Sequence, residues 1–443
     1  MPRATAASFV FEGVGTRGDV SPLIALGGAL VARGHQGHLL ACDDFGREAI
    51  AAGMTFHPTA ARVEVGADRE LPAGVRLARC FFPALAETAR VVRGIRAGAR
   101  RAPVVIVNCD RFVATSLLGE RDGLPLVRLH LSPFKIRSRV APPWPLRRQA
   151  EGLLGRTYLK YRLPRLLQAL DGDDRVLAII NRERSSLDLA PVTSAAGPEP
   201  WVRGQAALFP RWYARPAADW PAGITLLGFA LPPPAGRAPP ALDDFIARQG
   251  PPLVFTPGTG VAQVAGFFRA AEACCRQLGR PGIFLSPHLA GGRAVGPTDR
   301  IATFDYVDLG TFLDRAALLV HHGGIGTTAR ALQAGIPQII SPLGFDQPDN
   351  GDRVSSLGVG RVLARPQLSG AALAAAAGAL LHSPPVRLRL QRLREAVAGD
   401  DAIARCADLL EQVAQRETGG AGAPGGVTVT EAAPAGARCP AWT

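Results

Sequence analysis

A loop in the second half of the sequence has the residue types that bind a diphosphate. It reads HHGGIGTT over residues 321–328, between a strand-like apolar run and a helix-like run. Glycines let backbone N–H groups approach phosphate oxygens closely, and a helix N-terminus favours negative charge. His322 can donate a hydrogen bond to a phosphate oxygen as a leaving group forms. His322 and the glycines of this loop, Gly324 and Gly326 among them, are therefore candidate phosphate-binding residues.

An Asp-Gln pair follows this loop, 24 residues after His322. Asp346 and Gln347 stand after the next apolar run, in the segment FDQPDN, where we expect a helix to start. An Asp carboxylate accepts hydrogen bonds and a Gln amide both donates and accepts, which suits sugar hydroxyls. Alone, such a pair is an ordinary helix start. Its place after the glycine-rich loop favours a site for a phosphorylated sugar.

Asp19 is the candidate general base. It lies in the loop after the first expected strand, two residues before Ser21, which we expect to cap a helix that begins at Pro22. A helix N-terminus lowers the pKa of a nearby carboxyl group, whereas a useful base needs a pKa close to neutrality. Burial beneath a bound apolar acceptor would raise it again. The alternative is that Asp19 only complements the helix N-terminus.

The same loop also matches a dinucleotide fingerprint. Residues 13–18 fit the pattern G-x-G-x-x-G, and Asp43 and Asp44 lie where a ribose-binding acid is expected. The opposite charges of Arg17 and Asp19 beside the pyrophosphate position, and the late helix start, count against a nicotinamide site. A tight turn made by the glycines for structural reasons is a further interpretation.

Alternating strands and helices must position these loops. Each half of the sequence begins with an apolar strand, a glycine-rich loop and a helix, and then alternates, which predicts an α/β fold with two doubly wound, Rossmann-like domains. Ligands of such sheets bind beyond the carboxyl ends of the strands. The expected strands are 8–14, 38–42, 104–109, 126–131, 252–256, 282–285, 302–306, 317–321, 338–341 and 361–363, with helices near 81–98, 112–121 and 262–278.

A proline-rich connector separates the two halves. Residues 231–240, LPPPAGRAPP, can continue neither a helix nor a sheet. We therefore expect one domain over residues 1–230 and a second over 241–415, facing a central cleft. Residues 416–443 lack any periodicity and are predicted to be disordered.

The composition excludes several classes of protein. Hydrophobic residues make up 47% of the chain and charged residues 20%, enough for packed cores. No apolar run is long enough to span a membrane, and the N-terminus does not resemble a signal peptide, so we expect a cytoplasmic protein. Seven cysteines without C-x-x-C and eight histidines without H-x-x-x-H argue against a disulfide framework and against a bound metal.

Basic residues outnumber acidic ones by 50 to 37, and nearly all are arginine. Residues 135–165 concentrate this charge, with Lys135 and Lys160 among the basic residues, Glu151 as the single acid, and Trp144 and Tyr158 interleaved. The segment is either a peripheral contact with an anionic membrane surface or a solvated arginine face. An arginine-driven membrane-surface or nucleic-acid binding protein with an idle enzyme site is the alternative of a different class, although we expect no nucleic-acid partner.

Two segments resemble a known enzyme family. HHGGIGTTARALQAGIPQIISPLGFDQPDNGDRVSSLGVG resembles the donor-binding signature of the UDP-glycosyltransferase superfamily, and GVGTRGDVSPLIALGGALVARGH resembles the N-terminal loop of its bacterial antibiotic and sterol glycosyltransferase branches. The likeness covers both halves and excludes only the tail. It implies a GT-B fold and an inverting transfer of a hexose from a nucleotide diphosphate sugar, with a UDP-glucose type favoured, to an acceptor hydroxyl, without a cofactor or required metal.

The resemblance also implies roles for single residues. Asp19 matches the position of the catalytic base. Asp110 matches the acid that orients the base in relatives that use His. The alternative, of equal weight, is that Asp110 caps the helix expected near residue 112. The N-terminal domain would bind the acceptor and the C-terminal domain the donor. The matching donor-binding positions are Thr16, Arg17, Gly258, Thr259, His322, Gly324, Gly326, Thr327, Asp346 and Gln347.

Some positions depart from the family pattern. Plant relatives have a ribose-binding Glu where this sequence has Arg330, and residues 304–309, FDYVDL, lack the Trp on which those relatives stack the nucleobase. The acceptor is expected against residues 131–167, whose aromatic and aliphatic side chains suit an apolar aglycone or a lipid. An NAD(P)-dependent oxidoreductase is the rival enzyme, but it leaves residues 321–328 without a purpose. A nucleotide-sugar epimerase is disfavoured by Asp19 and the Asp-Gln pair.

Overall fold

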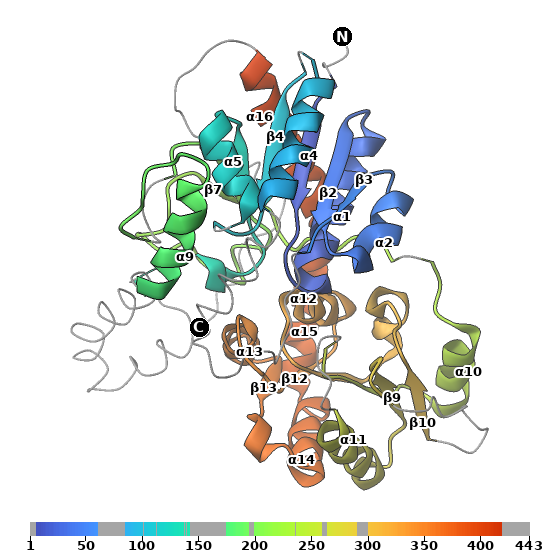
Figure 1. Cartoon of the computed structure of the whole chain (residues 1–443). Coiled ribbons are helices and arrows are strands. Elements are labelled where there is room, and N and C mark those ends of the chain that lie inside the picture. The colour runs from blue at the N-terminus through green and yellow to red at the C-terminus, as the bar shows by residue number, and fades with distance from the viewer. Residues whose placement is uncertain are drawn as a thin grey trace. The chain divides into compact units, whose positions relative to one another are not determined.

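The computed structural model divides the chain into two compact units (Figure 1). The first contains the chain up to Arg211, Arg215–Ala230 and the segment from Asp401; the second contains Trp212–Ala214 and Leu231–Asp400. The structure describes residues 6–60, 85–100, 102–111, 113–136, 138, 140–141, 174–194, 199–234, 236–258, 264–289 and 300–418.

The first unit is built on a seven-stranded sheet in which all paired strands are parallel, in the order β3-β2-β1-β4-β5-β6-β7. Its strands are β1 (Ser8–Glu12), β2 (Gln36–Ala41), β3 (Thr55–Pro58), β4 (Val104–Asn108), β5 (Leu126–His130), β6 (Val202–Ala207) and β7 (Ile224–Leu226). Its helices are α1 (Arg17–Ala32), η1 (Asp43–Phe45), α2 (Gly46–Ala51), α4 (Leu85–Gly98), α5 (Ala114–Asp122), η2 (Pro133–Lys135), α9 (Asp174–Ser185) and α16 (Ala402–Thr418).

Helices cover both faces of this sheet, as a parallel sheet requires. Successive strand side chains point to opposite faces. Phe9 and Phe11 of β1 pack in a core cluster with α1 and α16, whereas Val10, between them, packs in a second cluster with α4 and α5. Because helices cover both faces of the sheet, the loops with functional side chains lie at the ends of its strands.

The second unit has a six-stranded parallel sheet in the order β10-β9-β8-β11-β12-β13. Its strands are β8 (Leu253–Thr256), β9 (Gly282–Leu285), β10 (Ile301–Phe304), β11 (Leu318–His321), β12 (Gln338–Ile340) and β13 (Gly360–Val362). Its helices are α10 (Pro240–Gln249), α11 (Ala265–Leu278), η3 (Leu309–Thr311), η4 (Leu313–Arg315), α12 (Ile325–Ala334), α13 (Gln347–Ser356), η5 (Arg365–Gln367), α14 (Gly370–Leu381) and α15 (Pro384–Ala398).

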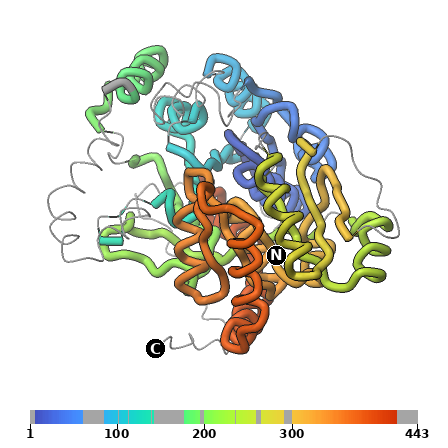
Figure 2. The backbone as a smooth tube through the Cα atoms, turned by 90° about the horizontal axis from the view of Figure 1, so that it is seen from below, coloured from blue at the N-terminus to red at the C-terminus, as the bar shows by residue number. Residues whose placement is uncertain are grey.

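Aromatic and aliphatic residues fill the second unit on both sides of its sheet. Phe245 of α10 packs with Val254 and Leu319 of the central strands. Phe255 meets Phe284 edge to face, with ring centroids 5.4 Å apart. Helices α11 and α14 pack against each other, and the yellow and orange elements of this unit can be followed in Figure 2. Both units thus have the Rossmann-like architecture that the alternating pattern predicts.

Helix α1 begins earlier than the sequence predicts. Its N-cap is Thr16, and the N–H groups of Asp19 and Val20 donate to the Thr16 carbonyl over 2.9 and 3.1 Å. The expected cap at Ser21 is therefore wrong, and Pro22 lies inside the helix. Hydrogen bonds between Thr16 and the Asp19 carboxyl stabilise the first turn. The helix therefore starts before Pro22, although proline has no backbone N–H to donate within it.

The last helix returns to the first unit. Instead of ending the second domain at residue 415, the chain from Asp401 packs as α16 beside α1, and in Figure 1 this red helix lies against the blue strands. Leu410 and Val413 of α16 are buried in the first core cluster, and Arg33 pairs with Asp408 over 2.6 Å. This apolar face is the physical reason for the difference from the expected domain boundary.

Two predictions fall largely outside the described residues. The helix extends to Thr418, so the tail expected to be disordered from residue 416 begins with helix, and residues 419–443 lie outside the described part. Most of the basic segment 135–165 also lies outside it, so its contact with a membrane stays a prediction, as does a cytoplasmic location. Among the helices that the structure describes, none is both long and apolar enough to cross a membrane.

Candidate active site

Asp19 lies in the first turn of α1, directly beyond the carboxyl end of β1. Its Oδ2 accepts hydrogen bonds from the Thr16 backbone N–H over 2.9 Å and from the Thr16 hydroxyl over 3.2 Å. Burial raises the pKa of the Asp19 carboxyl, and Asp110 adds to the rise, whereas Lys135 and the hydrogen bonds from Thr16 lower it. Desolvation outweighs the helix start, so the net shift is in the direction that a general base needs.

Asp110 follows β4 and forms an ion pair with Lys135. The Lys135 Nζ donates to the Asp110 Oδ1 over 2.8 Å. Helix α5 begins at Ala114, and its N-cap is Val113, so the interpretation of Asp110 as a helix cap is wrong. Lys135, which the sequence analysis placed only in a basic segment, is a member of the site that it missed. Its position just after the end of β5 was the available signal, because parallel strands end at one edge.

Two further titratable groups lie near this pair. Burial raises the pKa of the Cys109 thiol, with Asp110 adding to the rise, so the sulfur stays protonated. Burial lowers the pKa of His130 to about 4, and its Nε2 lies 3.0 Å from the Gln205 Oε1. The carboxyl ends of β1, β4 and β5 thus bring a carboxyl group, an ion pair, a thiol and a neutral imidazole to one edge of the sheet.

A buried polar network holds the loop that carries Asp110. The Arg128 guanidinium donates to the Asp110 backbone carbonyl and pairs with Glu199 over 2.7 Å. Glu12, at the end of β1, accepts the Thr115 N–H over 2.7 Å, and burial raises the pKa of Glu12 to about 7. The sequence analysis named none of these supporting residues, because each works through a partner far away in the chain.

The glycine-rich loop after β1 serves the helix start. Gly15 has a φ of +136°, and a Cβ there would lie 2.3 Å from the Asp19 Oδ2, so only glycine lets this carboxyl cap the helix. The Thr16 hydroxyl donates to the Asp19 carboxyl, and the Arg17 Nη1 lies 2.5 Å from the Glu48 Oε1. Thr16 and Arg17 are therefore engaged within the first unit, and the structural interpretation accounts for this turn without a dinucleotide.

His322 follows β11 in the second unit and is packed among glycines. A Cβ on Gly258 would lie 3.1 Å from the His322 ring, and one on Gly324 would lie 2.6 Å from its Nε2. Burial and the charge of Arg365 lower the pKa of His322 to about 4, so the imidazole is neutral near pH 7. Its Nδ1 is buried and has no hydrogen-bond partner within the described ranges, which leaves one ring nitrogen for a ligand.

Helix α12 starts directly after this histidine. Gly324 is its N-cap, and Gly326 is exposed with open space around its Cα. The first N–H groups of a helix have no partner within it and attract anions. The neighbouring His321 has a different function: its Nδ1 accepts the Gly323 N–H over 3.1 Å and its Nε2 lies 3.0 Å from the Gln338 Oε1, so it holds the loop in place.

Asp346 and Gln347 lie at the start of α13, and Asn350 joins Asp346 to the glycine-rich loop. The Asn350 side-chain amide donates to the Asp346 Oδ2 and to the Gly323 carbonyl, both over 2.9 Å. Its oxygen accepts the Tyr213 hydroxyl over 3.0 Å. The Gln347 Oε1 accepts the Leu343 N–H over 2.8 Å. The structure therefore brings the predicted phosphate and sugar residues together through Asn350, which the sequence analysis missed.

The remaining sequence predictions for this unit have separate outcomes. Thr259 lies outside the described residues. Arg330 donates to the Pro232 carbonyl and to the Gln333 side chain, so it supports the chain rather than replacing the ribose-binding Glu of plant relatives. Residues 304–309 lack the Trp on which plant relatives stack the nucleobase, and the aromatic residue Tyr306 of this segment is 54% exposed. Across the described ranges, no group of three or more His, Cys, Asp or Glu side chains could hold a metal ion.

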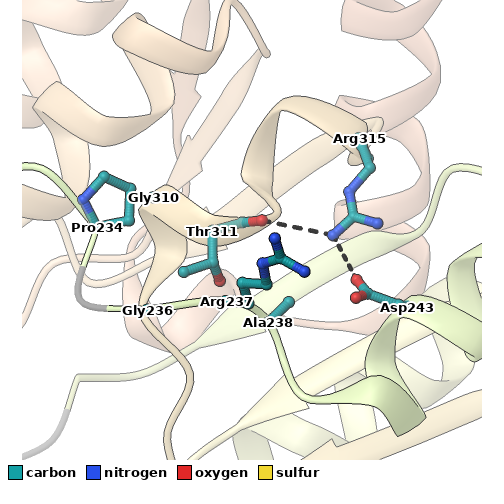
Figure 3. Close-up of a pocket in the computed structure, with 8 residues that line it drawn as sticks. All are labelled: Pro234, Gly236, Arg237, Ala238, Asp243, Gly310, Thr311 and Arg315. Atoms are coloured by element: carbon teal, nitrogen blue, oxygen red, sulfur yellow. Dashed lines mark hydrogen bonds and ion pairs between the residues drawn. The ribbon is translucent and has the colours of Figure 1, made fainter.

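A surface cavity of about 340 Å³ in the second unit lies at the proline-rich connector (Figure 3). Arg315 lines it and donates to the Asp243 Oδ1 over 2.7 Å. Its lining includes none of the predicted donor-binding residues, so we assign it no part in the candidate site. The described residues that line it are Pro234, Gly236, Arg237, Ala238, Asp243, Gly310, Thr311 and Arg315.

Sequence comparisons find glycosyltransferases over both units. The glycosyltransferase family 28 N-terminal domain matches residues 9–138, and the erythromycin biosynthesis protein CIII-like C-terminal domain matches residues 291–413. The chain is 30% identical to glycosyltransferase GtfE of Amycolatopsis orientalis, covering 89% of this chain and 95% of that protein. It is 27% identical to O-mycaminosyltylonolide 6-deoxyallosyltransferase of Streptomyces fradiae, with coverages of 91% and 97%.

Solved structures show the same fold. The calicheamicin glycosyltransferase CalG4 matches with a TM-score of 0.66 at 20% identity, covering 93% of this chain and 99% of that one. The glycosyltransferase SsfS6 of Streptomyces sp. SF2575, complexed with thymidine diphosphate, matches with a TM-score of 0.62 at 18% identity, with coverages of 92% and 99%. The chain, with its two Rossmann-like units, therefore has the GT-B fold.

The chain belongs to the UDP-glycosyltransferase superfamily, in its antibiotic glycosyltransferase-like branch. It is a sugar-transferring enzyme.

Proposed function

We propose that this enzyme transfers a hexose from a nucleotide diphosphate sugar to a hydroxyl group of an apolar acceptor, with inversion at the anomeric carbon. The observation that carries the proposal is the cluster in the second unit, where Asn350 joins the loop after His322 to Asp346. A phosphate-binding helix start and a pair of hydroxyl-binding side chains in one place fit a molecule that is both a phosphate ester and a sugar.

The second unit would bind the donor. The N–H groups at the start of α12, including those of Gly326 and Thr327, and the His322 imidazole would bind the diphosphate. Asp346 and Gln347 would bind the sugar hydroxyls. Gly258 contributes by its lack of a side chain, since a Cβ there would press on the His322 ring.

Asp19 would act as the general base. Both of its hydrogen bonds from Thr16 go to Oδ2, so we assign acceptance of the proton to Oδ1. As the acceptor hydroxyl loses its proton to Asp19, its oxygen would attack the anomeric carbon from the face opposite the diphosphate. The bond from that carbon to the diphosphate oxygen would break. Burial would keep the pKa of Asp19 raised, with a further rise from Asp110, and Lys135 would limit the rise.

The departing diphosphate would leave with its negative charge stabilised by the α12 amides and by a hydrogen bond from His322. Fixed donors of this kind are worth about 2.7–4 kcal/mol each in transition-state stabilisation. The proposal assigns the stabilisation of this charge to protein groups and calls for neither a cofactor nor a metal.

The donor nucleotide and the acceptor are the finer parts of the proposal. Gln347 favours a UDP-glucose-type donor. A dTDP-sugar is the second candidate, because two structural relatives are described as complexes with thymidine diphosphate. A relative described in complex with spinosyn aglycone supports a small-molecule acceptor. A lipid that carries a hydroxyl group is the second candidate acceptor.

A nucleotide panel tests the donor class directly. Thermal melting with UDP, dTDP, GDP and NADH should show a rise in melting temperature with UDP or dTDP, since a ligand that binds only the folded state stabilises it by mass action. A rise with NADH alone would overturn the proposal in favour of an oxidoreductase. Product analysis by NMR should then show an inverted anomeric configuration, and retention would contradict the role of Asp19 as base.

A further inference from the structure

Arg365, at the start of η5 just after β13, has an unusual environment in the second unit. Its guanidinium carbon lies 5.5 Å from the centroid of the Phe267 ring on α11. Its Nε and Nη2 are buried and have no hydrogen-bond partner among the residues that the structure describes. Arginine has five donors and no acceptor, and each buried donor without a hydrogen bond costs about 1–3 kcal/mol. Within the described part of the chain, the environment of Arg365 therefore lacks an acceptor that these two donors require.

A second group without a partner lies close to it. The Nδ1 of His322 is also buried, with no hydrogen bond to any described residue. Burial lowers the pKa of that imidazole and the charge of Arg365 lowers it further, so the two groups interact electrostatically. Strands β11 and β13 are both parallel to β12, so the segments after them, with His322 and Arg365, leave the same edge of the sheet. One ligand with several acceptor oxygens would satisfy both.

We propose that Arg365 is a further donor-contacting residue, whose guanidinium binds a phosphate group of the nucleotide diphosphate together with His322. This inference rests on the proposed function. A phosphate matches the requirement better than a sugar hydroxyl, because the planar guanidinium binds phosphate oxygens through two parallel hydrogen bonds and the phosphate neutralises its charge. The sequence analysis gave no role to Arg365.

The competing explanation is that Arg365 only packs on Phe267 as a cation over a ring. The two explanations differ in the effect of Arg365→Met on the ligand-free enzyme. If the guanidinium is there for a ligand, its removal takes away two buried donors that lack hydrogen bonds, and the melting temperature without ligand should stay equal or rise. If the ring contact is structural, the melting temperature should fall and nucleotide binding should be unaffected.

The test compares Arg365→Met with Arg361→Met, which removes an exposed arginine of β13 four residues earlier. Calorimetric titration uses UDP or dTDP, whichever binds the wild-type enzyme more tightly. We expect Arg365→Met to weaken that Kd by about 10- to 100-fold, the usual effect of losing hydrogen bonds from a charged group. Arg365→Lys, which keeps the charge and loses the planar fork, should lie in between, and Arg361→Met should match the wild type.

The outcomes separate this inference from the proposed function. If the wild type binds neither nucleotide, the proposed function fails and this inference fails with it. If the wild type binds a nucleotide and Arg365→Met binds it equally well, only the inference about Arg365 is overturned. The matching nucleoside, titrated at millimolar concentrations, checks the group contacted: equal weakening for nucleoside and nucleotide would overturn the assignment to phosphate.

Discussion

The Asp19 carboxyl caps helix α1 and is also the proposed general base, and the two functions can be separated by mutation. Asp19→Asn keeps an oxygen that can accept the Thr16 N–H, so the helix start should survive. Loss of a general base should lower kcat by about 100- to 10,000-fold, with the donor Kd changed by less than about twofold. Steady-state kinetics and calorimetry measure both. Asp43→Asn, an exposed change in η1, is the control, and an unchanged kcat in Asp19→Asn would remove Asp19 from the mechanism.

Lys135 should set the pH dependence of the reaction through Asp19. The positive charge of Lys135 lowers the pKa of Asp19 directly. Lys135 also pairs with Asp110, whose negative charge raises the pKa of Asp19. In Lys135→Met both effects are lost, so the pKa of Asp19 should rise and the acidic limb of the kcat profile should move to higher pH. Lys135→Met combined with Asp110→Asn should move the limb back part of the way. A profile that Lys135→Met leaves in place would contradict the coupling.

Glu12 should make folding depend on pH. Burial raises the pKa of Glu12 from 4.5 to about 7, so between these values the folded chain binds more protons than the unfolded chain. The free energy of unfolding should therefore fall as pH rises through this window. Glu12→Gln keeps an acceptor for the Thr115 N–H, and between pH 4 and pH 8 it should gain up to about 3 kcal/mol relative to wild type.

Urea unfolding at several pH values measures this difference. Glu87→Gln, which changes a carboxyl that is 46% exposed on α4, should stay parallel to the wild type at every pH. A constant gap between Glu12→Gln and the wild type would mean that the pKa of Glu12 is the same in the folded and unfolded states, and would contradict the rise caused by burial.

At the level of secondary structure, helix α13 depends on Asn350 for its attachment to the loop before α12. Asn350→Leu would leave the Tyr213 hydroxyl and the Gly323 carbonyl without this partner, and each buried polar group without a hydrogen bond costs about 1–3 kcal/mol. We expect the free energy of unfolding to fall by about 2–5 kcal/mol, and donor affinity to fall with it. Tyr213→Phe, which removes one of these bonds, should cost less. Equal losses in both variants would mean that the bond to Gly323 contributes nothing.

For the chain as a whole, the return of α16 to the first unit links the stability of that unit to the far C-terminal segment. Leu410 is fully buried in the first core cluster, so Leu410→Ala should lower the free energy of unfolding of the first unit by about 2–5 kcal/mol. Urea unfolding followed by tryptophan fluorescence measures it, since Trp201 and Trp220 belong to that unit. Leu388→Ala, at a leucine that is 52% exposed on α15, should change it little. A similar small change in Leu410→Ala would contradict the assignment of α16.

Much of the scaffold followed from local patterns. Apolar runs bounded by glycine and proline predicted β1, β2, β4 and β5 of the first sheet and every strand of the second to within a few residues. The short strands β3, β6 and β7 were not predicted, because half-buried strands with polar residues lack such a run. The loops with His322 and Asp346 were found because glycine, histidine and carboxylate chemistry is visible in a few adjacent letters.

Partners far apart in sequence could be found only in three dimensions. Lys135 pairs with Asp110, which lies 25 residues earlier in the sequence. Helix α16 packs against α1 although the second domain separates the two helices in the sequence. Arg365 acquires its significance only because no described residue provides an acceptor for its Nε and Nη2. Local sequence records the propensity of a segment and the chemistry of a side chain. The pairing, desolvation and pKa of that side chain depend on which distant groups the folded chain brings beside it.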